Sequence, residues 1–192
     1  MKRWICALLA ALLLPAAAAA ADYDPKQNYL DILFRAACCG DRDAGRAAAI
    51  CYNEWLDDRH SLAARLDFDE LLWLAKIIEH EAGSSGIGLD WRMCVGEVVL
   101  NRVASPEFPD TLREVVYQRG QYNVVNTARF STLAPRRPCV DAALRLLQGE
   151  RRMVPAVVFQ SDSIQGELFT MYADRRLGNT YFCLSERLEL YP

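Results

Sequence analysis

The residues that could do chemistry in this chain are few, because histidine occurs only at His60 and His80. A Ser or Cys nucleophile needs a base, and His60 lies in the charged stretch DDRHS, which is typical of a solvated surface. No HExxH or GxSxG pattern is present, and the cysteines lack the spacing of zinc ligands. We therefore expect no metal and no cofactor, and any catalysis falls to carboxylates.

The most informative carboxylate is Glu81, in the run IIEHEAG. It follows Ile77 by four residues and Ile78 by three, so it lies at the edge of an apolar helical stripe near the helix C-terminus, whereas Glu79 points elsewhere. Desolvation and the negative end of the helix dipole both predict a raised pKa for Glu81. A carboxyl group that stays protonated near neutral pH suits a general acid, although a Glu at a helix end is more often simply solvated.

The elements that position Glu81 are predicted to be helical over most of the chain. Asp67 with Glu70 fits a capping box that starts the Glu81 helix, and Gly83 ends it. Apolar spacing and start and stop signals predict six helices: 24–40, one from Asp41 or Asp43 to about Trp55, 67–83, one from Asp90 to before Pro106, 110–117 and 138–149. Residues 118–137 read as an irregular loop, and a loop of that length is usually functional.

The C-terminal part changes character to β-branched and aromatic runs at 156–160, 168–172 and 180–184. These runs predict a small antiparallel sheet after the helices, and hence an α+β fold. We divide the chain into a leader (1–21), an N-terminal helical hairpin (22–66) and a catalytic domain (67–192).

The N-terminus predicts export. Lys2 and Arg3 precede an apolar run and an alanine tract, as in a secretory signal peptide cleaved after Ala20 or Ala21. The alternative is an uncleaved membrane anchor, which would be the only membrane contact. Cleavage leaves 20 basic and 25 acidic residues (22 − 2 basic, 25 acidic), a net charge of −5, which argues against a nucleic-acid partner.

Six cysteines remain after cleavage, and an even number in an exported protein permits disulfides. The alternative is that several are small buried hydrophobic residues. We expect at least one bridge, between Cys51 and either Cys38 or Cys39.

Five runs stand out between about Asp69 and Leu184: LAKIIEHEAG, the long block CVGEVVLNRVASPEFPDTLREVVYQ, RGQY, and the closing VVFQ and GNTYFC. On these runs the segment resembles the SleB-like cell-wall hydrolases, the spore cortex-lytic type. The long block is specific, whereas each short piece alone would be weak. Two departures stand out: Glu79-His80 precede Glu81 where small or aromatic residues are common in the family, and Thr180 replaces a frequent His.

The resemblance implies a lysozyme-like fold, peptidoglycan glycan strands as substrate and Glu81 as the catalytic acid. It also implies substrate contacts from Gln121 and Tyr122, with Gln118 and Asn101 as further candidates. Asn101 and its neighbour Arg102 suit a structural role better, since they end a helix and can tie down the next turn.

No second carboxylate stands out, because Asp162 and Glu167 match no trusted motif. A single acid favours a lytic transglycosylase over a hydrolytic N-acetylmuramidase or glucosaminidase. The remaining alternatives are a non-catalytic peptidoglycan-binding wall protein and an exported helical module with no sugar partner. Whichever holds, we expect a secreted or cell-wall-associated protein.

Overall fold

The structure is a computed structural model that describes residues 24–191, so the predicted signal peptide lies outside the described residues. Its elements confirm an α+β fold, with helices followed by a small antiparallel sheet. In chain order they are α2 (Pro25–Cys39), α3 (Arg42–Asp57), α4 (Phe68–Ala82), α5 (Leu89–Ala104), α6 (Leu112–Tyr117), the 3-10 helix η1 (Asn123–Asn126), α7 (Ala128–Thr132), α8 (Arg137–Leu147), β1 (Val157–Ser161), β2 (Leu168–Asp174), β3 (Gly178–Leu184) and η2 (Leu188–Leu190).

Side-chain caps start several helices where the sequence places them. Asp24, Asp41 and Asp67 each accept a backbone N–H in the first turn of α2, α3 and α4. Two starts differ from the prediction: α5 begins at Leu89, behind Gly88, rather than at Asp90, and Thr111 rather than Asp110 caps α6. In α6 the Thr111 hydroxyl accepts from the Glu114 N–H, so the neighbouring Asp is not needed as a cap.

The prediction that residues 118–137 form an irregular loop is wrong in part. This stretch contains η1 and α7, two short helical pieces too brief to show an apolar period in the sequence. Thr127 caps α7 by accepting from the Phe130 N–H at 3.2 Å, and the Phe130 side chain is buried. The segment is therefore anchored to the core.

Helix α5 lies at the centre of the molecule and packs against α4, α8, α6 and β1. Close packing depends on Gly96, where an added Cβ would come within 2.6 Å of Leu146 and 2.7 Å of Ile78. Four of its polar side chains are buried with the apolar ones, which a surface helix would not allow: Arg92, Glu97, Asn101 and Arg102.

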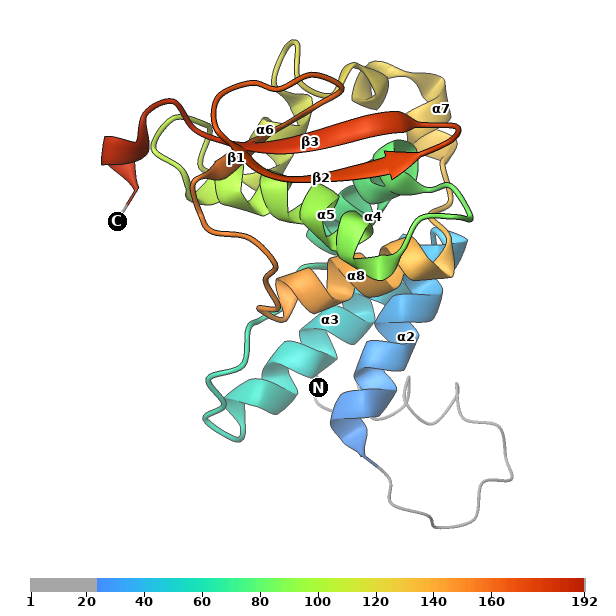
Figure 1. The fold of residues 1–192 in the computed structure, drawn as a ribbon. Coiled ribbons are helices and arrows are strands. Elements are labelled where there is room, and N and C mark those ends of the chain that lie inside the picture. The colour runs from blue at the N-terminus through green and yellow to red at the C-terminus, as the bar shows by residue number, and fades with distance from the viewer. Residues whose placement is uncertain (1–23, 192) are drawn as a thin grey trace.

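The sheet has the strand order β1-β3-β2, with both pairings antiparallel, and it covers one side of α5 (Figure 1). Tyr172 of β2 stacks on Trp91 of α5, with ring centroids 5.4 Å apart, and its edge meets Phe182 of β3. The face of β1 and β3 that carries Gln160 and Phe182, which are paired across the strands, therefore points toward the helices.

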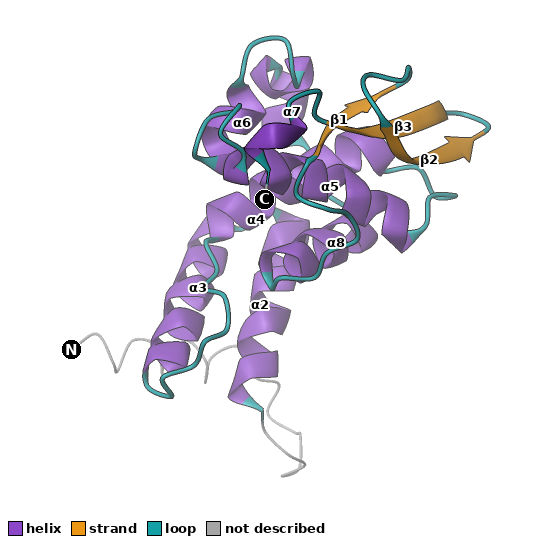
Figure 2. Ribbon diagram, turned by 60° about the vertical axis from the view of Figure 1, so that its left-hand side comes forward, coloured by secondary structure: helices purple, strands orange, loops and turns teal. Residues whose placement is uncertain are grey.

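Helices α2 and α3 form a hairpin that extends away from the sheet, on the opposite side of α8 (Figure 2). The predicted disulfide in this hairpin is wrong, because no disulfide joins any of the six cysteines of the described residues. Cys51 lies ten residues beyond Asp41, about 15 Å along α3, whereas Cys38 and Cys39 end α2 at the turn. A disulfide needs the two Cα atoms within about 7 Å. Within residues 24–191, no helix is both long and apolar enough to cross a membrane.

Candidate active site

Glu81 lies in the last turn of α4, with 31% of its side chain exposed. Burial of the rest raises the pKa of its carboxyl group, and the neighbouring His80 opposes this by lowering it. The His80 Nε2 lies 3.9 Å from Glu81 Oε1. The carboxyl group thus combines a partly desolvated setting with access from outside, as a proton donor requires.

The second oxygen of Glu81 faces Gln160, which comes from β1. Gln160 donates from Nε2 to Glu81 Oε2 at 3.5 Å, which is longer than a usual N–H···O hydrogen bond. The other end of the same amide, Gln160 Oε1, is buried and has no hydrogen-bond partner among the described residues. An acceptor in this state is rare in a folded protein.

Tyr122 is buried beside this group. Burial raises the pKa of its phenol, the nearby Arg102 lowers it, and the charge of Glu81 raises it, which places Tyr122 within electrostatic reach of the proposed acid. Arg102 Nη1 donates to the Tyr122 hydroxyl at 3.5 Å. Tyr122 is therefore a buried neighbour of Glu81 and Arg102.

Gln118 and Gln121 flank a tight turn that presents Tyr122. The Gln121 N–H donates to the Gln118 carbonyl at 3.2 Å, and Gly120 between them has φ of 85°, which this type of turn needs at its third position. Gln121 is exposed and free to meet a substrate. Gln118 is half-buried, and its Oε1 has no partner among the described residues.

Asn101 is buried, and its amide is already in use. Its Nδ2 donates to the carbonyls of Val154 and Val157, each at 3.0 Å. One turn earlier, Glu97 accepts the N–H of Arg152 at 2.7 Å and of Met153 at 3.1 Å. These bonds hold the segment that leads into β1, so the geometry fits the structural role of Asn101 rather than contact with sugar.

Arg102 also binds the segment that leads into β1. Its Nε donates to the Val158 carbonyl at 2.7 Å, and its guanidinium lies over the rings of Phe108 and Tyr122. We call Glu97, Asn101 and Arg102 the α5 clamp. The sequence predicts that the Asn-Arg pair ties down the next turn, whereas the clamp holds residues 152–158, some 55 positions further along the chain.

Other carboxylates are placed differently. Glu79 points away from Glu81 and binds the start of α8, accepting from the Arg136 N–H at 3.0 Å and its Nε at 2.8 Å. Asp162 and Glu167 are both exposed, in the connection between β1 and β2. The charge that acts on Glu81 is that of His80 rather than theirs.

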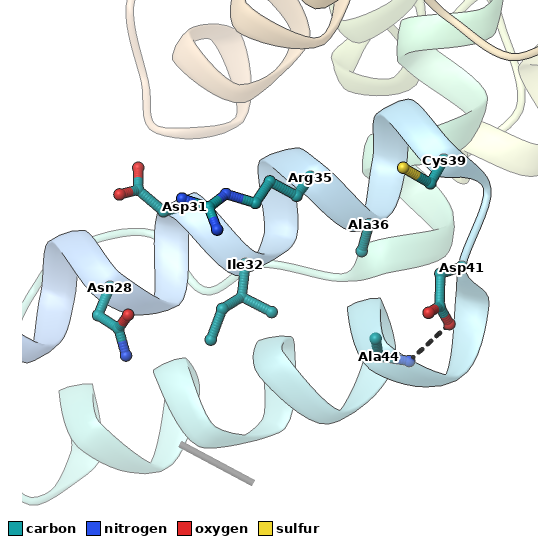
Figure 3. Close-up of a pocket in the computed structure, with 8 residues that line it drawn as sticks. All are labelled: Asn28, Asp31, Ile32, Arg35, Ala36, Cys39, Asp41 and Ala44. Carbon is teal, nitrogen blue, oxygen red and sulfur yellow. Dashed lines mark hydrogen bonds between the residues drawn. The ribbon is translucent and has the colours of Figure 1, made fainter. Parts of the chain in front are cut away.

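The described residues also line a groove of about 210 Å³ between α2 and α3 (Figure 3). Asn28, Ile32 and Ala36 line it, and Asp41 lies at one end, where it caps α3 through the Ala44 N–H. No residue of the Glu81 site lines this groove. Within residues 24–191 no cluster of three or more His, Cys, Asp or Glu side chains could hold a metal ion.

Sequence reasoning missed two residues of this region, Gln160 and Glu97. Gln160 ends the run VVFQ, where a polar side chain follows three apolar residues on a strand. Glu97 is a carboxylate inside an otherwise apolar helical stripe, four residues before Asn101. Both signals are visible in the sequence, but their partners are not.

No curated protein and no solved structure matches the chain significantly, so the lysozyme-like fold stays a prediction. A family match covers just under half of the chain. It includes the α5 clamp, the Gln121-Tyr122 turn and Gln160, but it begins eight residues after Glu81 and does not bear on that residue. Residues 89–183 match the family described as Cell Wall Hydrolase, which supports a peptidoglycan-degrading function.

Proposed function

We propose that this chain is an exported enzyme that cleaves peptidoglycan glycan strands as a lytic transglycosylase, with Glu81 as its acid and base. The observation that carries the proposal is the setting of Glu81, whose pKa is raised by burial while part of its side chain remains open. The family match supplies the class of substrate. Export is supported by the signal-peptide pattern of residues 1–21.

The reaction needs one proton-transferring group. Protonated Glu81 donates to the glycosidic oxygen as the bond from this oxygen to muramic C1 breaks. The resulting carboxylate then takes the proton of the muramic 6-hydroxyl as O6 bonds to C1. The products are a 1,6-anhydro-muramic end and a free 4-hydroxyl on the leaving sugar, and Glu81 regains its proton without water.

Gln121 is the exposed member of the turn and is proposed to contact sugar, with Gln118 next to it. Tyr122 contributes as a wall beside Glu81. Asn101 is proposed to act only through the segment that it holds.

Mass spectrometry of the products from purified peptidoglycan tests the proposal. We expect anhydro-muropeptides from the wild-type protein and none from Glu81→Gln. New reducing ends without anhydro products would identify a hydrolase, with Asp162 and Glu167 the first carboxylates to substitute. Binding to insoluble peptidoglycan without any product would identify a wall-binding protein instead. Intact mass of the exported protein should correspond to a start at Ala21 or Asp22.

A further inference from the structure

The two oxygens of the Glu81 carboxyl group have different neighbours. Oε2 faces the amide Nε2 of Gln160 at 3.5 Å, and Oε1 faces His80 Nε2 at 3.9 Å. An amide N–H can donate only to an oxygen lone pair, so it favours the form of a protonated carboxyl group in which that oxygen carries no hydrogen. The proton of a neutral Glu81 is therefore directed to Oε1.

The position of Gln160 is fixed from both sides. Its backbone pairs with Phe182 in β3, and the segment before it is held by the α5 clamp through Val157 and Val158. A side chain on such a strand has little freedom to follow a moving partner. Gln160 can therefore impose an orientation on Glu81, which sits at the end of a helix.

We propose that Gln160 is the positioning residue of the Glu81 acid: its N–H occupies Oε2 and leaves the proton on Oε1. This inference rests on the proposed function of Glu81. Three charged or titratable groups surround the pair, namely His80 on α4, Tyr122 on the turn, and Arg102 of α5 behind Tyr122.

The test compares the pH dependence of wall clearing in wild type, Gln160→Leu and Gln160→Glu. Leucine removes the N–H that stabilises the ionised form of Glu81, so the alkaline limb should move to higher pH. Glutamate adds a like charge and should move the limb further, as a property of the pair. The maximal rate of Gln160→Leu should fall about 10- to 100-fold, because the acid is no longer oriented.

Gln27→Leu is the matched control, because Gln27 is an exposed residue on α2 whose side-chain amide donates to Asp31. It should leave both the rate and the pH profile unchanged. Unchanged thermal midpoints for all three variants would show that folding is intact. A Gln160→Leu profile that falls in height without moving along the pH axis would overturn the proposal.

A second measurement separates this inference from the function itself. Carbon-13 NMR titration of the Glu81 carboxyl group reports its pKa whether or not the protein cleaves walls. A higher pKa in Gln160→Leu than in wild type supports the positioning contact even if no anhydro product is found. An identical pKa contradicts the contact, even in a protein whose lytic activity depends on Glu81.

Discussion

Glu81 on α4 and Glu97 on α5 are carboxylates on packed neighbouring helices, and burial raises the pKa of both. Glu97 is completely buried, and two backbone N–H groups, from Arg152 and Met153, fill its oxygens. Glu81 keeps part of its side chain exposed and has one long contact from an amide.

The difference shows how one fold can use the same side chain in two ways. Two N–H donors lower the pKa of Glu97 against the effect of burial, so its charge is matched by the loop that it holds. No backbone N–H among the described residues lowers the pKa of Glu81 in this way, and His80 alone opposes the effect of burial. The α5 clamp has the contacts of a structural site, whereas Glu81 has those expected of the proposed acid.

Glu81→Gln should give the largest effect on activity. Glutamine keeps the size of the side chain but cannot transfer a proton, so wall clearing should fall at least about 10²- to 10⁴-fold. The measurement is turbidity loss of a cell-wall suspension. Glu79→Gln is the control on the same helix and should keep most of the activity, because Glu79 serves α8. Equal clearing of walls by Glu81→Gln and by wild type would contradict the proposed role of Glu81 as the catalytic acid.

Glu97→Gln should show the reverse pattern, a loss of stability. The amide can accept one of the two N–H groups but presents its own donors to the other. One buried donor left without a partner costs about 1–3 kcal/mol of unfolding free energy. Urea unfolding would measure this cost. A Glu97→Gln protein of unchanged stability that has lost its activity would contradict a purely structural role for Glu97.

Arg102→Lys should cause a smaller loss of stability, because this residue joins the α5 clamp to Tyr122, which lies beside the proposed acid. Lysine keeps the charge but loses the Nε–H that binds the Val158 carbonyl and the flat contact with the Phe108 and Tyr122 rings. We expect a cost of about 1–2 kcal/mol in unfolding free energy, with a modest loss of rate. An unchanged melting temperature would mean that the guanidinium contacts contribute nothing.

The smallest effect concerns the pH dependence of stability. The pKa of Glu81 in the folded protein lies above its ordinary value of 4.5. The unfolded chain therefore ionises first as pH rises, and the folded state loses stability between the two pKa values. Glu81→Gln removes this loss, so its melting temperature should gain on that of wild type as pH rises through this window. Glu186→Gln, at an exposed position, is the control. A constant difference across pH would contradict the raised pKa.

The fold was largely predictable from local signals. Asp24, Asp41 and Asp67 cap the helices that their spacing predicts, and the three C-terminal runs form the expected strands. The short helices at 123–126 and 128–132 were not predictable, because each is shorter than the stretch needed to show a period. The predicted hairpin disulfide is wrong because the number of cysteines says nothing about how far apart two of them lie in the folded helices.

The site was less predictable. The environment of Glu81 follows from its place on the apolar stripe, and the raised pKa is confirmed. The contact with Gln160 could not be predicted, because it joins residues 79 positions apart. Asn101 shows the same limit. From the sequence its side chain could contact substrate, but in the structure its amide is bound by the carbonyls of the distant Val154 and Val157.

The α5 clamp joins residues that lie far apart in the sequence, and this separation affects the order in which parts of the protein fold. Glu97 and Asn101 bind residues 152–157, and Glu81 contacts Gln160. A chain completed only through α8 therefore contains the proposed acid but lacks the residue that contacts it. Contacts of such separation form late in folding, after local helices. If the proposed wall-degrading activity appears only after these contacts form, the protein is inactive for most of the time it takes to fold. During refolding, the helical circular dichroism signal should therefore recover before the lytic activity.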